Sequence, residues 1–183
     1  KKTHTVAGLE AAALAVTGCA TTAKTDWRQA VDEQLPALGH RNWIVVADSA
    51  YPRQSAPGIN TIYTGADHLE TLRTVLQKLD AAEHVTPVIL LDAELKHVAE
   101  KDAPGVQAYR RELRSMLEGE QIKTMNHEDI IRELDEGSKL FNILLLKTDL
   151  TIPYTSVFLQ LDCKYWSAEK EMRLRKALEE AKQ

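Results

Sequence analysis

The stretch Trp43-Ile44-Val45-Val46-Ala47-Asp48 decides the fold of this chain. Its first five residues are all apolar and mostly β-branched, which is typical of a strand that is buried on both faces of a parallel sheet. His40 lies shortly before this run, and Asp48 directly follows it. Because a strand rises about 3.3 Å per residue, these two side chains should lie at opposite ends of one strand, roughly 25 Å apart.

Outward from this strand, apolar runs and helical patterns alternate along the chain. We expect further strands at about 59–63, 87–91, 121–124, 140–147 and 157–161, and helices at about 26–38, 67–79, 104–117, 127–136 and 167–181. Strands separated by helices indicate an α/β fold, with a mainly parallel sheet in a three-layer α/β/α arrangement. In such sheets, ligands bind beyond the carboxyl ends of the strands.

Several helix ends carry residues of the expected kind. Side chains with an oxygen precede the helical patterns and are suited to cap them, namely Thr25 or Asp26, Asp67 and Ser167. Gly39 and Gly137 are expected to end the helices before them, with Gly39 in a left-handed conformation. His68, at a helix start, and His84, at a helix end, are expected on the surface.

The composition limits the classes of function. Apolar residues make up 44% and charged residues 27% of the 183 residues, which is typical of one folded domain rather than of a disordered chain. The net charge is −4 and no block of Lys or Arg stands out, so a nucleic-acid surface is not expected. Cys19 and Cys163 are too few for a disulfide framework or a four-ligand zinc site. No nucleotide-binding or metalloprotease motif is present, so the polar side chains at strand ends are the candidates for a site.

Residues 1–23 differ from the rest of the chain. Lys1 and Lys2 precede a mostly apolar stretch, which ends in Val16-Thr17-Gly18-Cys19. This order is that of a secretory signal, and its last four residues resemble the lipobox of bacterial lipoproteins, in which the cysteine is lipidated. We therefore expect a leader with a short linker at 1–23, a lipid anchor at Cys19, and a periplasmic or membrane-anchored protein. The alternative is a disordered or helical extension of a cytoplasmic protein. Residues 24–183 then form the domain, with the last helix as an extension.

Three motifs resemble those of the ribose pyranase and fucose mutarotase family (RbsD/FucU-like). The segment from Leu38 to Pro52 resembles the family's opening, which is Leu-Gly-His-Gly-Asp, a strand ending in Ala-Asp or Cys-Asp, and a loop ending in Pro. Pro153-Tyr154-Thr155-Ser156 is similar to the family's Tyr-Gly-Asn or Tyr-Ala-Asn before an apolar strand. Met125-Asn126-His127-Glu128-Asp129 resembles the Thr-His-Glu-Glu stretch of the pyranase branch. The family's Gly-Asp is replaced here by Arg41-Asn42, and its Asn by Ser156.

The resemblance implies an RbsD-like fold and an enzyme that interconverts the α and β anomers of a free sugar, without a cofactor. It also implies a ring-shaped homo-oligomer whose active site lies between neighbouring subunits. In this chain, His40 is then the general acid/base, and Asp48 is its charged partner or a sugar-hydroxyl acceptor. Tyr154 is the second acid/base or a hydroxyl-binding group, and His127 and Ser156 bind the substrate.

Arg53 follows the Asp48 loop, where it can reach a sugar hydroxyl or lie free on the surface. The chemistry suits these residue types, because opening a pyranose removes a proton from the anomeric hydroxyl and delivers one to the ring oxygen. A histidine near its free pKa can perform either step at neutral pH.

Two other functions remain open. The fold can serve a non-catalytic protein that binds a monosaccharide, or a partner-binding protein that uses its terminal helix. For single residues, His40 is alternatively a histidine that caps a helix end, and Tyr154 an aromatic side chain that packs at an edge strand.

Overall fold

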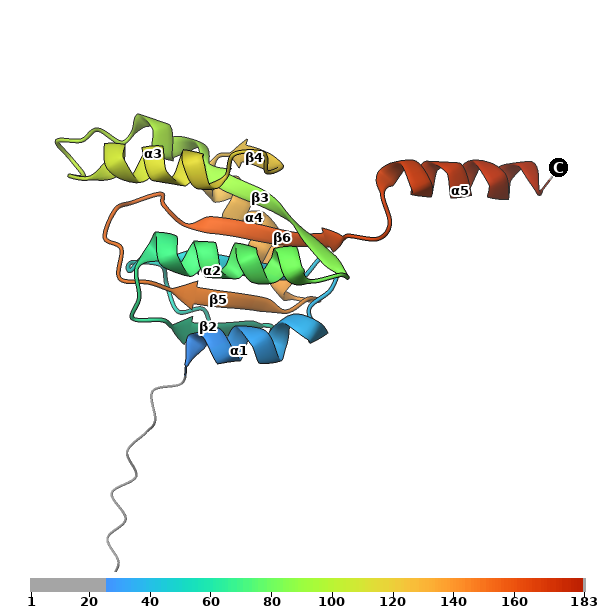
Figure 1. Cartoon of the computed structure of the whole chain (residues 1–183), viewed down its shortest axis with the longest axis horizontal. Helices are drawn as coiled ribbons and strands as arrows, with labels where there is room; N and C mark the ends of the chain where they lie inside the picture. Colours follow the sequence, from blue (N-terminus) through green and yellow to red (C-terminus); the bar gives the residue numbers. More distant parts are fainter. Residues whose placement is uncertain (1–25, 183) are drawn as a thin grey trace, which may run out of the picture.

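One sheet of six strands forms the centre of the protein, in the order β2-β5-β1-β6-β3-β4 (Figure 1). The computed structural model describes residues 26–182, so the predicted leader at 1–23 and its Cys19 lie outside the described residues. The strands are β1 (Trp43–Ala47), β2 (Ile59–Tyr63), β3 (Val85–Asp92), β4 (Ile122–Met125), β5 (Ile143–Lys147) and β6 (Val157–Cys163). Only β6 runs antiparallel to its neighbours, β1 and β3, which confirms the mainly parallel sheet.

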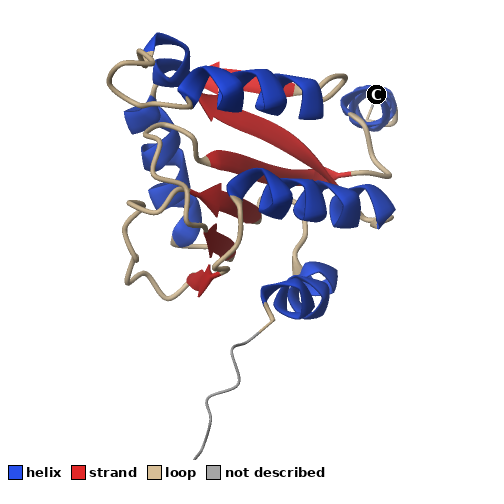
Figure 2. Ribbon diagram, turned by 60° about the vertical axis from the view of Figure 1, so that its left-hand side comes forward, coloured by secondary structure: helices blue, strands red, loops and turns tan. Residues whose placement is uncertain are grey.

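Helices cover both faces of this sheet (Figure 2). The helices are α1 (Trp27–Gln34), α2 (His68–Ala81), α3 (Val106–Met116), α4 (His127–Ser138) and α5 (Ala168–Glu180), and two short 3₁₀ helices are η1 (Leu35–Ala37) and η2 (Ala93–His97). Helices α1, α2 and α3 pack on one face, and α4 packs on the other. The expected three-layer α/β/α arrangement is therefore confirmed.

Strand β1 explains why the core has two halves. Its side chains alternate, so that Ile44 and Val46 join the core under α1, α2 and α3. Trp43, Val45 and Ala47 join the core under α4. All five are buried, as the uninterrupted apolar run predicts for a central strand.

The predicted start caps are confirmed where the structure describes them. The carboxylates of Asp26 and Asp67 accept hydrogen bonds from the backbone N–H groups of Arg28 and Glu70 at the starts of α1 and α2. The Ser167 hydroxyl does the same at the start of α5, where it accepts from the backbone of Lys170.

Both predicted glycine ends were wrong, for different reasons. After α1, Pro36 lies within η1, and the left-handed residue is Arg41, with a φ of 73°. Gly137 lies inside α4, where a Cβ would come within 3.2 Å of Nε1 of Trp43. This glycine therefore serves the close packing of α4 on β1 rather than the end of the helix.

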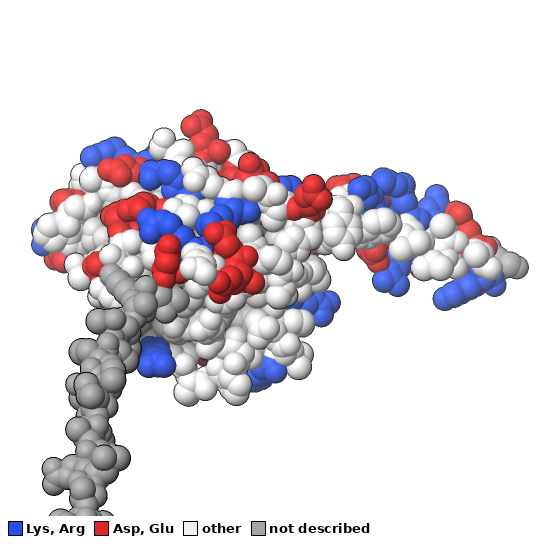
Figure 3. All heavy atoms as spheres, turned by 60° about the horizontal axis from the view of Figure 1, so that its bottom comes forward, with Lys and Arg blue, Asp and Glu red and all other residues white. Residues whose placement is uncertain are grey.

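Helix α5 extends away from the rest of the protein (Figure 1), and both signs of charge alternate along it (Figure 3). None of its residues is buried. Among the described residues, no helix is both long enough and apolar enough to cross a bilayer.

Candidate active site at the carboxyl edge of the sheet

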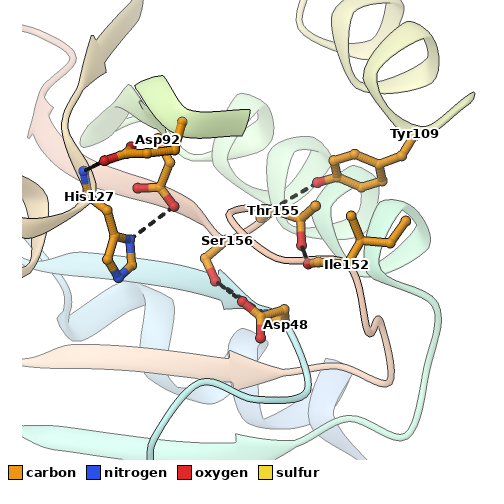
Figure 4. Close-up of polar contacts among 8 residues, drawn as sticks. Asp48, Asp92, Tyr109, His127, Ile152, Thr155 and Ser156 are labelled. Carbon is orange, nitrogen blue, oxygen red and sulfur yellow. Dashed lines mark hydrogen bonds and ion pairs between the residues drawn. The ribbon is translucent and has the colours of Figure 1, made fainter. Parts of the chain in front are cut away.

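Four segments bring polar side chains to the carboxyl edge of the parallel strands. Asp48 follows β1, Asp92 ends β3, and His127 begins α4 directly after β4. Ser156 precedes β6, and because β6 is antiparallel, its start lies at this same edge. Figure 4 shows these four side chains around one region. This is the edge at which ligands of parallel α/β sheets bind.

His127 is held from two directions. Its ring nitrogen Nδ1 lies 3.1 Å from Oδ2 of Asp92, and its backbone N–H donates to the Glu94 carboxylate, at 3.0 and 3.1 Å from the two oxygens. The Asp92 side chain is fully buried, whereas 31% of the His127 side chain is exposed. Burial raises the pKa of the Asp92 carboxyl to about 6, although the nearby His127 opposes this rise. The pair therefore combines a protected carboxylate with an accessible imidazole.

Tyr154 stands beside this pair in an unusual backbone conformation. Its φ is 59°, a left-handed value that non-glycine residues adopt at a cost. Its ring meets the His127 ring edge-on, with the ring centroids 5.6 Å apart and the planes 83° apart. Tyr154 is 39% exposed, so its phenol remains accessible to a ligand.

Asp48 is fixed by the loop that carries Tyr154. The Ser156 hydroxyl donates to Oδ2 of Asp48 at 3.0 Å, and the backbone N–H of Asp48 donates back to that hydroxyl at 3.3 Å. The N–H of Ala50 donates to the other carboxylate oxygen at 2.8 Å. The carboxylate thus faces the edge with a fixed orientation, as suits a hydroxyl-binding group.

A buried network lies beneath the Tyr154 loop. The Tyr109 hydroxyl donates to the carbonyl of Thr155 at 2.9 Å, and Thr155 donates its own hydroxyl to the carbonyl of Ile152 at 2.7 Å (Figure 4). Nδ1 of His68 lies 3.3 Å from the Tyr109 hydroxyl, and its Nε2 lies 3.2 Å from the carbonyl of Val46. The Tyr109 hydroxyl thus ties the loop to the core directly after Tyr154, and the Thr155 hydroxyl closes the turn that contains Tyr154.

His68 is therefore not the surface group that its position predicted. It is 1% exposed, and burial lowers its pKa to about 4, although the contact with the Val46 carbonyl opposes this shift. A signal for its burial is present in the sequence, because His68 lies four, seven and eleven residues before Leu72, Val75 and Leu79, on the same face of α2.

Asp92 was also missed, although it follows a buried strand just as Asp48 does. That parallel between β1 and β3 is the signal that points to it. Its partner His127 was predicted as a substrate-binding residue, and the structure places it at the edge with Tyr154, Asp48 and Ser156.

His40 lies at the other end of the sheet. Its Nδ1 is 2.8 Å from Oδ1 of Asp162, so in one protomer its carboxylate partner is Asp162 rather than Asp48. The histidine that caps a helix end is instead His84, whose Nε2 lies 3.2 and 3.0 Å from the carbonyls of Leu35 and Leu38. His84 is partly exposed.

A hollow of about 730 Å³ lies on the side of α4, and its lining includes none of the residues at the carboxyl edge, Asp48, Asp92, His127, Tyr154 and Ser156. His40 and Asp162 line one end of it, and Met125, the neighbour of Asp92 in the sheet, lines the other. Arg53 is exposed in the loop after β1. Among residues 26–182, no three His, Cys, Asp or Glu side chains lie close enough together to hold a metal ion.

Comparison with known proteins identifies relatives of this chain. Residues 28–162 match the model of the RbsD / FucU transport protein family, whereas no curated protein matches the sequence. The structure of Bacillus subtilis RbsD complexed with D-ribose is similar, with a TM-score of 0.53 and 18% identity, over 73% of this chain and 91% of that chain. The fucose mutarotase from Streptococcus pneumoniae in complex with L-fucose has a TM-score of 0.51 and 20% identity, over 78% of this chain and 97% of that chain. Both likenesses show a shared fold.

Proposed function

Because this chain belongs to the RbsD/FucU transport protein family, we propose that it interconverts the anomers of a free monosaccharide by acid/base catalysis without a cofactor. The observation that carries the proposal is the convergence of His127, Tyr154, Asp48 and Ser156 on one edge of the sheet. These side chains offer proton-transfer groups next to a fixed acceptor for sugar hydroxyls. The structures that share the fold hold D-ribose and L-fucose, so we infer a pentose or a 6-deoxyhexose as the substrate.

The reaction needs two proton transfers. A base takes the proton from the anomeric hydroxyl, the C1–O5 bond breaks, and an acid protonates the ring oxygen. The open aldehyde then turns about the C1–C2 bond, and closure on its other face gives the other anomer. Each positioned acid or base contributes about 10²–10⁴-fold.

His40 reaches this site from a second copy of the chain. In one protomer, His40 pairs with Asp162 at the amino edge, and Tyr154 contacts His127 at the carboxyl edge. At about 3.3 Å per residue, the extended segment from His40 to Asp48 separates the two edges by about 25 Å. We therefore infer a ring-shaped homo-oligomer in which His40 of one subunit completes the carboxyl edge of the next, where Asp48 and Tyr154 lie. We also propose that Arg53, which is exposed in the loop after β1, contacts the sugar.

Exchange of the sugar anomers, followed by saturation-transfer NMR on D-ribose and on L-fucose, tests the activity. The wild-type protein should accelerate exchange, and His40→Ala should abolish this acceleration with little change in melting temperature. A protein that shifts the sugar signals but leaves the exchange rate at its buffer value would instead be a non-catalytic binder.

A mixing experiment tests the shared site. His40→Ala and Tyr154→Phe subunits, each inactive alone, should recover about a quarter of the wild-type rate when they are assembled together in equal amounts, because a random ring then pairs an intact His40 with an intact Tyr154 at that fraction of its interfaces. If both groups serve within one protomer, the mixture stays inactive.

The partner-binding alternative makes a different prediction. The exposed helix α5 includes Leu174 and Leu178. If this helix is the functional element, deleting 167–183 abolishes association while the sugar fails to raise the melting temperature. Under the proposed function, D-ribose or L-fucose raises the melting temperature of the truncated protein as well.

A further inference from the structure

We propose that Asp92 and His127 act together as a proton-transfer pair, in which Asp92 is a positioning residue that directs Nε2 of His127 to take the proton from the anomeric hydroxyl. This inference rests on the proposed function and deepens it, because it assigns the base to a single protomer. His127 then becomes a catalytic residue rather than only a group that binds the sugar.

The geometry fixes which nitrogen serves the sugar. Nδ1 lies 3.1 Å from Oδ2 of Asp92, and the Asp92 side chain is fully buried. Nε2 lies on the opposite side of the imidazole, and 31% of the His127 side chain is exposed. The Glu94 carboxylate holds the backbone N–H of the same residue, and the Tyr154 ring stands edge-on beside it. His127 is thus restrained by contacts to its backbone N–H, to its ring nitrogen Nδ1 and to one side of its ring.

The hydrogen bond to Asp92 selects the tautomer. An ionised carboxylate can only accept, so the neutral imidazole carries its proton on Nδ1 and leaves the lone pair on Nε2 free to accept a proton. When Nε2 takes the anomeric proton, the imidazolium that forms faces a negative charge in a protected site. In the same step, C1=O forms and the C1–O5 bond breaks, and the ring oxygen receives its proton from the acid, which is His40 of the neighbouring copy under the proposed function.

The burial of Asp92 supports a functional role for this carboxylate. One of its oxygens, Oδ1, is buried without a hydrogen-bond partner among the described residues. The titratable groups that face Asp92 are His127, Glu94, Asp48, Tyr51 and Tyr109, and four of these five, all except His127, are not cationic at any pH. A carboxyl group held in this way costs stability, and such groups concentrate at sites where proton transfer uses them.

The variant Asp92→Asn tests the pair, because it keeps the shape and removes the charge. The exchange rate of D-ribose or L-fucose should fall by roughly 100-fold, the lower end of what a positioned acid or base contributes. The matched control is Asp129→Asn, which makes the same change two residues beyond His127, where Asp129 forms an exposed ion pair with Arg132. The control should keep its rate within about twofold.

A double variant shows whether the two residues act as one unit. His127→Gln should lower the rate as much as Asp92→Asn does, and combining the two should lower it no further. If the two losses multiply, Asp92 and His127 act separately and the pair is overturned.

A spectroscopic measurement separates this inference from the proposed function. The ¹⁵N signals of His127 in the sugar-free wild-type protein should report a proton on Nδ1, and Asp92→Asn should shift the ring towards a mixture of tautomers. An unchanged tautomer, or an exchange rate within twofold of wild type, overturns the pair. A wild-type protein that accelerates no exchange overturns the proposed function instead, whatever the tautomer.

Discussion

Two histidine–aspartate pairs lie at opposite ends of the same sheet, in very different surroundings. At the amino edge, His40 and Asp162 are 2.8 Å apart, and about half of each side chain is exposed, 56% and 51%. At the carboxyl edge, His127 and Asp92 are 3.1 Å apart, and the carboxylate is fully buried. The shorter contact is therefore the one that water screens. Burial, rather than distance, distinguishes the two pairs.

The comparison shows what burial adds to the same two residue types. An exposed pair contributes about 0–1 kcal/mol, because solvent weakens the attraction and two side chains must be ordered. In the buried pair, desolvation raises the pKa of Asp92 to about 6, so that its charge depends on pH close to neutrality. The carboxyl-edge pair thus contains a buried carboxyl group whose charge changes close to neutral pH.

The largest expected effect on stability involves Asp92 of the buried pair and a second buried titratable group, His68. The pKa of His68 falls from 6.5 in the unfolded chain to about 4 in the folded protein. Its contribution to stability is therefore complete above about pH 6.5, and about 3 kcal/mol of it is lost as the pH falls to 4. The pKa of Asp92 is raised in the folded protein, so its contribution to stability has the opposite pH dependence. This contribution is present below about pH 4 and is lost as the pH rises to about 6.

These two trends oppose each other in the wild-type protein, and Asp92→Asn removes one of them. We expect the free energy of unfolding of this variant, measured by urea titration from pH 7 to pH 4, to fall more steeply than that of the wild type. Equal slopes for the two proteins would show that the Asp92 carboxyl titrates as it does in the unfolded chain.

A smaller effect of the same variant is expected at fixed pH. At pH 8, Asp92→Asn should raise the free energy of unfolding by about 2 kcal/mol, because it removes the cost of a buried charge. The variant is then more stable and less active, which is typical of a functional residue held at a cost to stability. A loss of stability at pH 8 would mean that the ion pair with His127 outweighs that cost.

The turn before β1 offers a test at the amino edge. Arg41, next to His40, has a φ of 73°, at the position where the family's motif has a glycine. Arg41→Gly should raise the free energy of unfolding by about 0.5–1 kcal/mol, because glycine adopts this conformation without a steric cost. Thermal unfolding followed by circular dichroism measures the change. A decrease in the free energy of unfolding would indicate that contacts of the Arg41 side chain stabilise the protein by more than the left-handed backbone conformation destabilises it.

The smallest effect is expected for the exposed pair itself. Asp162→Asn should change the free energy of unfolding by less than about 1 kcal/mol at any pH between 5 and 8. The measurement is made on the isolated protomer, at a concentration where sedimentation shows no assembly. A loss of more than 2 kcal/mol there would remove the contrast between the two edges.

Much of the fold and part of the site could be predicted from residue patterns. The uninterrupted run in β1 predicts a central buried strand, and the positions of Asp48 and His40 predict opposite edges, as observed. His127 and Tyr154 were singled out through the resemblance of their motifs, and they contact each other in the structure. Their roles in catalysis stay predictions.

What could not be predicted depends on contacts between distant segments. Asp92 is buried and contacts His127 at the start of α4, 35 residues further along the chain, and no local pattern reports such a contact. The partner of His40 comes from the end of β6, which is antiparallel, so Asp162 lies at the amino edge although it lies 122 residues away in sequence. The left-handed conformations of Arg41 and Tyr154 were missed because neither is a glycine.

The central claim is that the carboxyl edge binds a sugar next to the accessible nitrogen of His127. The ¹⁵N spectrum of the histidine rings, recorded as D-ribose or L-fucose is added, tests it most directly. The account predicts that the Nε2 signal of His127 moves and saturates with the sugar, while Nδ1 keeps the shift of a nitrogen bonded to Asp92. An Nε2 signal that stays in place at saturating concentrations of both sugars would contradict it.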